Sequence, residues 1–109
     1  MGNFVSSQGQ LGDTSSPTTI HTVTAGKELH QLDIVFFNTD TVAVEVILYI
    51  GAKATSKKIL NISLSAPPSE KATFPMVIKQ RLAAGTDIDA EAESGKGSKI
   101  NYFFTGIEV

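Results

Sequence analysis

Apolar and polar residues alternate along most of this chain with a period of two, which is the repeat of a β-strand. The highest density of β-branched and apolar residues is found in residues 42–50, VAVEVILYI. A second apolar run covers residues 32–37, and the four residues between the runs, NTDT, favour a turn. The pattern therefore predicts a β-hairpin formed by the two runs, with residues 42–50 as the central strand of a sheet.

Further short strands are predicted wherever the alternation resumes between turn residues. We expect them over residues 19–24, 29–38, 56–64, 73–80, 86–93 and 99–109. Pro75 has no N–H group to donate, which favours an edge position for the strand around it. No segment shows a sustained helical repeat. About seven or eight short strands at regular spacing predict an all-β fold, a single antiparallel β-sandwich or jelly roll.

The first nineteen residues differ in composition from the rest of the chain. They are rich in Ser, Gly, Gln and Thr, and their large apolar residues are Phe4, Val5 and Leu11. Such a segment buries too little apolar surface to offset its conformational entropy alone. We therefore predict two parts, an extended, flexible N-terminal arm over residues 1–19 and a β-sandwich domain over residues 20–109.

Composition excludes several classes of function. The 109 residues contain no cysteine, so disulfides, thiolate metal sites and a cysteine nucleophile are absent. The net charge of −2 argues against a nucleic-acid partner. The first six residues fit the N-myristoylation template, but one acyl chain binds membranes only marginally and no basic cluster follows. No membrane partner and no membrane-spanning helix are expected.

Four carboxylates, Asp87, Asp89, Glu91 and Glu93, alternate with apolar residues in one predicted strand. A straight strand spreads these groups about 6–7 Å apart, whereas Ca²⁺ requires oxygens that converge on one point. We therefore interpret them as a solvated face that discourages edge pairing, with cation binding or the docking of a basic partner as the alternative.

No other motif indicates catalysis. His21 and His30 have no metal-binding spacing, and no serine stands at a nucleophile elbow. Residues 95–99, GKGSK, lack the order of a phosphate-binding loop and favour a turn. The sequence thus predicts a protein that is not an enzyme and that carries no metal or cofactor.

Two predicted strands, residues 32–37 and 99–109, carry apolar residues on both faces, more than one sandwich core needs. A subunit or partner would cover the surplus. We expect a homo-oligomer, such as a trimer, in which the N-terminal arm lies on a neighbour. The residues expected to bind partners are Phe4, Leu11, Phe37, Phe103 and Ile107.

Several corners and strand ends resemble small β-sandwich virion proteins of tailed bacteriophages. Residues 21–27 (HTVTAGK) form the first corner, followed by strands that end in residues 38–39 (NT) and 48–50 (LYI). A later corner at residues 82–87 (LAAGTD) precedes a final strand that ends in residues 106–109 (GIEV). The likeness covers roughly residues 20–109 but has no counterpart for residues 52–69.

This resemblance implies a structural protein of a phage particle, made in the host cytoplasm and located in the virion. It implies a head-decoration (cement) or a neck and tail accessory protein, which associates with itself and with the major capsid protein or another virion protein. The alternative is a carbohydrate- or receptor-binding module of a phage neck, tail or fibre. That alternative requires exposed aromatic residues, and the chain has no Trp and two Tyr.

Overall fold

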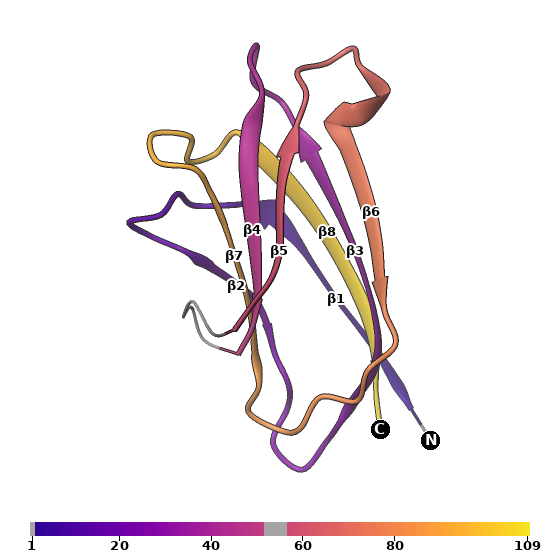
Figure 1. Cartoon of the computed structure of the whole chain (residues 1–109). Helices are drawn as coiled ribbons and strands as arrows, with labels where there is room; N and C mark the ends of the chain where they lie inside the picture. Colours follow the sequence, from indigo (N-terminus) through magenta and orange to yellow (C-terminus); the bar gives the residue numbers. More distant parts are fainter. Residues whose placement is uncertain (1, 52–56) are drawn as a thin grey trace.

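The computed structural model describes residues 2–51 and 57–109, and in these ranges it confirms the all-β prediction. Two antiparallel four-stranded sheets pack face to face as a sandwich (Figure 1). Sheet A has the order β1 (Asn3–Gln10), β8 (Ile100–Glu108), β3 (Leu29–Asn38) and β6 (Thr73–Ile78). Sheet B has the order β2 (Thr18–Thr22), β7 (Asp87–Ala92), β4 (Val44–Ile50) and β5 (Lys58–Leu64).

Outside the strands, the described residues include one turn of 3₁₀ helix, Glu70–Ala72. No helix in the described ranges has the length and hydropathy needed to span a membrane. The predicted edge position of the strand that contains Pro75 is confirmed, since β6 is the last strand of sheet A. The preceding strand in the sequence was predicted to start at Ser56, and that residue lies outside the described residues.

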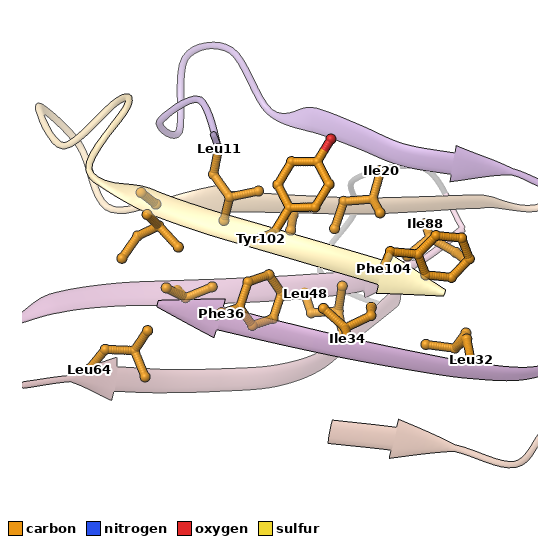
Figure 2. Close-up of a cluster of buried hydrophobic side chains, with 14 of the residues drawn as sticks. Leu11, Ile20, Leu32, Ile34, Phe36, Leu48, Leu64, Ile88, Tyr102 and Phe104 are labelled. Carbon is orange, nitrogen blue, oxygen red and sulfur yellow. The ribbon is translucent and has the colours of Figure 1, made fainter. Parts of the chain in front are cut away.

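The core lies between the inner faces of the two sheets (Figure 2). Phe36 of β3 and Phe104 of β8 are its largest fully buried side chains, and Leu48 of β4 is buried in the opposing sheet. Removing a buried aromatic side chain of this size typically costs about 3–5 kcal/mol of stability. The alternation of buried and more exposed residues along β8, and along β3 from Leu32 onward, follows from this single interior layer.

The predicted hairpin between residues 32–37 and 42–50 is wrong. β3 pairs with β8 and β6 in sheet A, whereas β4 pairs with β7 and β5 in sheet B. The inner residues Leu32, Ile34 and Phe36 of β3 and Val44, Val46 and Leu48 of β4 are apolar, and placing the two strands in opposite sheets lets these residues pack across the core. Residues 42–50 are nevertheless central as predicted, because β4 is an interior strand of its sheet.

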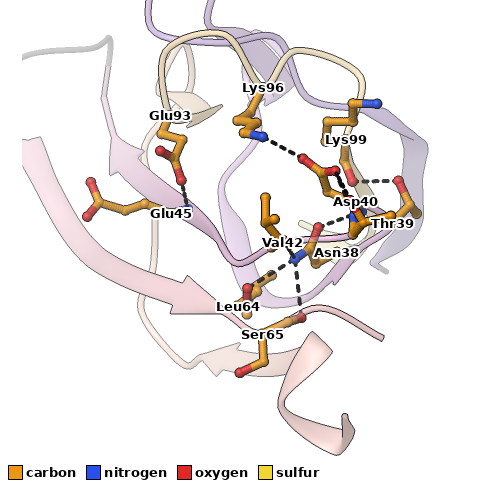
Figure 3. Close-up of polar contacts among 11 residues, drawn as sticks. Asn38, Thr39, Asp40, Val42, Glu45, Leu64, Ser65, Glu93, Lys96 and Lys99 are labelled. Carbon is orange, nitrogen blue, oxygen red and sulfur yellow. Dashed lines mark hydrogen bonds and ion pairs between the residues drawn. The ribbon is translucent and has the colours of Figure 1, made fainter. Parts of the chain in front are cut away.

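Asn38 shapes the connection that carries the chain from sheet A to sheet B (Figure 3). Its side chain is fully buried, and its Nδ2 donates to the carbonyls of Val42 at 2.9 Å, Leu64 at 3.0 Å and Ser65 at 3.2 Å. Its Oδ1 accepts a hydrogen bond of 2.8 Å from the backbone N–H of Asp40. One side-chain amide at the end of β3 in sheet A thus satisfies backbone groups of the connection itself and of the end of β5 in sheet B.

The Gly-rich loop before β8 is tied to this connection and serves as a turn. Lys96 Nζ lies 2.8 Å from Asp40 Oδ2, and Thr39 Oγ1 donates to the carbonyl of Lys99 at 2.7 Å (Figure 3). The hydrogen bond from Lys96, together with one from the N–H of Thr41, lowers the pKa of Asp40 below its usual value. The loop lysine therefore contacts a carboxylate of the chain itself.

The N-terminal segment is part of the sandwich rather than a separate arm. β1 pairs with β8 over eight consecutive residues, and β2 begins at Thr18. Leu11, expected to reach a neighbouring subunit, is 1% exposed in the chain's own core. The reason lies in the backbone, because ladder hydrogen bonds form regardless of side-chain hydrophobicity and add to the burial of Leu11.

The acidic strand also differs from its predicted role as a solvated edge. β7 is an interior strand, and Asp89 and Glu91 are only 8% and 1% exposed. Thr19 Oγ1 donates to Asp89 Oδ1 at 2.8 Å, and the Tyr49 hydroxyl donates to Glu91 Oε1 at 2.6 Å. Side chains on an interior strand lie between those of two neighbours, which here supply hydroxyl donors for the carboxylates.

Candidate functional site

The main candidate site is the side of sheet A that faces away from the core, here called the outer A face. The strands of this sheet place their less exposed residues on the inner side and their more exposed residues on the outer side. The outer residues are Phe4, Ser6, Gln8 and Gln10 of β1, Asn101, Phe103, Thr105 and Ile107 of β8, Gln31, Asp33, Val35 and Phe37 of β3, and Thr73, Pro75 and Val77 of β6.

An apolar row crosses the middle of the outer A face. Val35 is in register with Phe103 on one side and with Pro75 on the other. Phe37 and Val77 flank this row as diagonal neighbours on β3 and β6. Phe103 is 48% exposed, Phe37 38% and Val77 55%, so the row presents apolar surface to solvent. Contiguous apolar surface of this kind is typical of protein contact sites.

A second apolar group lies toward the free end of β1. Phe4 is 86% exposed and is in register with the half-buried Ile107 on β8. A depression of about 80 Å³ lies beside this pair, lined by Phe4, Gln31, Asp33, Thr105, Gly106 and Ile107. A volume this small fits a single side chain rather than a cofactor or a sugar.

The two outer faces of the sandwich differ in charge. On the outer A face, Asp33 is the single ionisable residue. On the outer side of sheet B, the exposed Glu45 and the half-buried Asp87 and Glu93 add negative charge beside the buried Asp89 and Glu91. Depletion of charge together with exposed aromatic residues is the composition that distinguishes the core of a protein interface.

The structure brings together four of the five residues predicted to bind partners. Phe4, Phe37, Phe103 and Ile107 all lie on the outer A face, whereas Leu11 does not. The sequence pattern does not reveal the contributions of β6 and of Val35, because the row they form depends on strand register. The two-face apolar pattern of β3 and β8 was the signal that located the rest.

Other chemistry-bearing residues are engaged within the fold. His21 Nε2 lies 2.7 Å from Glu108 Oε2, and its ring stacks on Phe104 at a centroid distance of 5.1 Å. His30 lies apart, with Nε2 3.1 Å from Glu28 Oε1. In residues 2–51 and 57–109, no cluster of three or more His, Asp or Glu side chains could hold a metal ion.

Neither tyrosine offers an exposed ring for sugar stacking, since Tyr49 and Tyr102 are 4% and 9% exposed. Burial and the hydrogen bond to Glu91 raise the pKa of Tyr49 to about 12. The Tyr102 hydroxyl lies 3.2 Å from Ser7 Oγ of β1. Both rings thus act in packing and in hydrogen bonds within the sandwich.

Comparison with known proteins gives structural matches without sequence matches. The chain fits no protein-family profile, and no curated protein sequence matches it significantly. Its structure is similar to a chain in the acidic stable capsid structure of Helicobacter pylori bacteriophage KHP30, with a TM-score of 0.65 and 9% identity. That alignment covers 99% of this chain and 86% of the capsid chain.

A second match is a chain from Bacillus endospore appendages, which form disulfide-linked pili. Its TM-score is 0.58 at 10% identity, and the alignment covers 99% of this chain and 85% of that one. Similarity at this level of identity establishes a shared fold. The described chain is therefore a β-sandwich of a kind found in a chain of a phage capsid structure and in a chain of endospore appendages.

Proposed function

We propose that the protein is a non-enzymatic structural component of a tailed-phage particle. In this proposal it decorates or cements the capsid, through self-association and through contacts with the major capsid protein. The virion is its final location, after synthesis in the host cytoplasm. The fold it shares with the phage-capsid chain supports this proposal, as do the phage-like corners of the sequence.

The observation that carries the proposal is the outer A face. A sandwich of this size needs one core, and the chain already has one between its sheets. Phe4, Phe37, Phe103 and Val77 nonetheless remain exposed on one side, where a single charged residue is present. Burying apolar surface contributes about 25 cal/mol per Å², so covering this face favours association.

Such a function needs no catalytic group. A particle repeats the same contact many times by symmetry, so weak individual interfaces add up to stable attachment. The two matched chains described above come from protein assemblies, a capsid and a pilus. The pili are described as disulfide-linked, and this chain has no cysteine, so that means of linkage is not open to it.

Co-sedimentation with capsids prepared without this protein tests the proposal. We expect the purified protein to sediment with such capsids and Phe103→Asp to bind at least tenfold more weakly. The control is Ile59→Asp, because Ile59 is 44% exposed on β5 of sheet B, close to the exposure of Phe103. Circular dichroism of both variants checks that they keep the fold.

The proposal fails if the protein does not sediment with capsids, or if Phe103→Asp and Ile59→Asp bind equally well. A parallel glycan panel separates it from the carbohydrate-binding alternative. If the protein bound glycans but not capsids, the structural function would be rejected in favour of recognition of a sugar receptor.

A further inference from the structure

The free side of β1, here called the β1 edge, differs from the other sheet edges among the described residues. β1 keeps a continuous register with β8 over eight residues and has no charged residue, proline or bulge. In contrast, β6 contains Pro75, β2 has a bulge between Thr19 and His21, and β5 begins at Lys58 with a shifted register. Charge, proline and bulges are the devices that keep sheet edges from pairing with other chains.

The β1 edge is also open in the described part of the chain. β1 is the end strand of sheet A, and its one strand partner is β8. None of its side chains is buried, and Val5 and Ser7 are the half-buried ones on its inner side. An end strand leaves every second N–H and C=O group directed away from its partner. The β1 edge therefore presents backbone N–H and C=O groups that can pair with a further strand.

We propose that the β1 edge pairs antiparallel with the β1 edge of a second copy about a two-fold axis. This pairing joins the two A sheets into one continuous sheet. It specifies the self-association part of the proposed function and rests on it. The occupant is a second copy because β1 has no ionisable side chain, so identical strands meet without like-charge repulsion.

The register of such a pair follows from the alternation of side chains. Directly opposite residues of an antiparallel pair lie on the same face. A pair centred on Ser6 places Ser6 opposite Ser6 of the second copy and Phe4 opposite Gln8. Since Gln8 is in register with Phe103 within each copy, Phe4 then lies over the Gln8 stem toward Phe103. This arrangement covers Phe4, the most exposed large apolar side chain of the described residues at 86%.

Pairing through one strand is a small contact, well below the roughly 800 Å² per partner of a stable dimer. We therefore expect a dimer that forms reversibly at high protein concentration and that is reinforced on a particle surface. Sedimentation velocity at protein concentrations from about 10 µM to 1 mM measures it.

A charge placed at the centre of the pair tests the register. Ser6 is exposed, so Ser6→Lys leaves the fold intact but sets two lysines opposite each other. We expect its dimer dissociation constant to rise about fivefold or more. An equimolar mixture of Ser6→Lys and Ser6→Glu restores dimers. Ser63→Lys on β5, exposed on the edge of sheet B, is the control and keeps wild-type dimerisation.

Cross-linking gives an independent readout. The chain has no cysteine, so Ser6→Cys introduces a single thiol, which we expect to form a disulfide-linked dimer under mild oxidation. Ser63→Cys remains monomeric under the same conditions. The inference is overturned if the wild type stays monomeric at 1 mM, or if Ser6→Lys dimerises like the wild type. A dimer that does not bind capsids would instead overturn the proposed function and leave this pairing in place.

Discussion

His21 of β2 and Glu108 of β8 belong to different sheets, and Nε2 of the histidine lies 2.7 Å from Oε2 of the carboxylate. The same oxygen accepts the backbone N–H of Thr24 at 3.0 Å. Glu108 is 4% exposed, and burial alone would raise its pKa. The hydrogen bonds from Thr24 and His21 outweigh burial and lower the pKa of Glu108 below 4.5. This contact joins the two sheets at the end of the sandwich where β8 finishes.

Glu108→Gln is expected to destabilise the protein by about 1–3 kcal/mol at pH 7, because a hydrogen-bonded charge is lost from a buried site. A carboxylate whose pKa is lowered by folding stabilises the folded protein in full at pH values above its unfolded-state pKa. That contribution disappears as the pH falls from about 4.5 through the lower folded-state value. Urea unfolding at several pH values measures the difference between wild type and variant, which should be largest near neutral pH.

Glu28→Gln is the matched control, since Glu28 makes the exposed pair with His30. Exposed ion pairs of this kind contribute little to the free energy of unfolding. The effect of Glu28→Gln on that free energy should therefore stay within about 0.5 kcal/mol. Equal effects for the two variants, or a Glu108→Gln effect independent of pH, would contradict the role assigned to the buried contact.

Asn38→Asp is expected to be more damaging than Asn38→Ala. The buried amide Nδ2 donates to three carbonyl oxygens, and a carboxylate would face the same three acceptors with no proton to offer. We expect a loss of about 3 kcal/mol or more, measured by thermal and urea unfolding. Asn101→Asp on the exposed side of β8 serves as control and should change stability little. An Asn38→Asp protein as stable as the control would refute the bridging role of this amide.

Tyr49 should titrate later than an ordinary tyrosine. Burial and Glu91 raise its pKa from 10.0 to about 12. A raised folded-state pKa means that its stabilising contribution is full below pH 10 and is lost between about pH 10 and 12. Absorbance at the phenolate band, followed together with circular dichroism, should show one tyrosine ionising above pH 11 or together with unfolding. Tyr49→Phe should remove that late phase, and an unchanged titration curve would contradict the assignment.

Gly106→Ala should destabilise the middle of sheet A by about 1–3 kcal/mol. A Cβ atom at this position would lie 2.7 Å from Leu29 Cδ1 and 3.0 Å from the Gln31 carbonyl oxygen. The control is Gly97→Ala, whose Cβ would have its nearest neighbour, the N atom of Asp13, at 3.7 Å. Chemical denaturation should separate the two variants clearly. Similar stabilities would show that β3 and β8 adjust to the added methyl group.

Strand positions and faces were predictable from the sequence because they depend on local alternation. The bounds predicted for β3, residues 29–38, are those of the structure, and Leu32, Ile34 and Phe36 are buried as expected. Strand partners were not predictable in the same way. The neighbours of β3 are β8 and β6, which lie far away in the sequence, and a period of two does not say which strand lies alongside.

The same limit explains what was missed around the site. The burial of Glu91 depends on the Tyr49 hydroxyl of the adjacent strand, which no local pattern reveals. The sequence did not predict β1 as a strand, because this strand pairs through backbone groups and its side chains are of the types found in disordered segments. Phe37, Phe103 and Ile107 were found because their exposure follows from the alternation of their own strands.

The position of β8 has a consequence for synthesis on the ribosome. β8 follows all other strands in the chain, yet it lies between β1 and β3 and pairs with both. At roughly 5–20 residues per second, β1 leaves the ribosome on the order of 5–20 s before its partner strand exists. Sheet A therefore closes only after translation of β8. Until then nascent chains on one messenger expose β1, and neighbouring ribosomes could bring these strands together before any copy has folded.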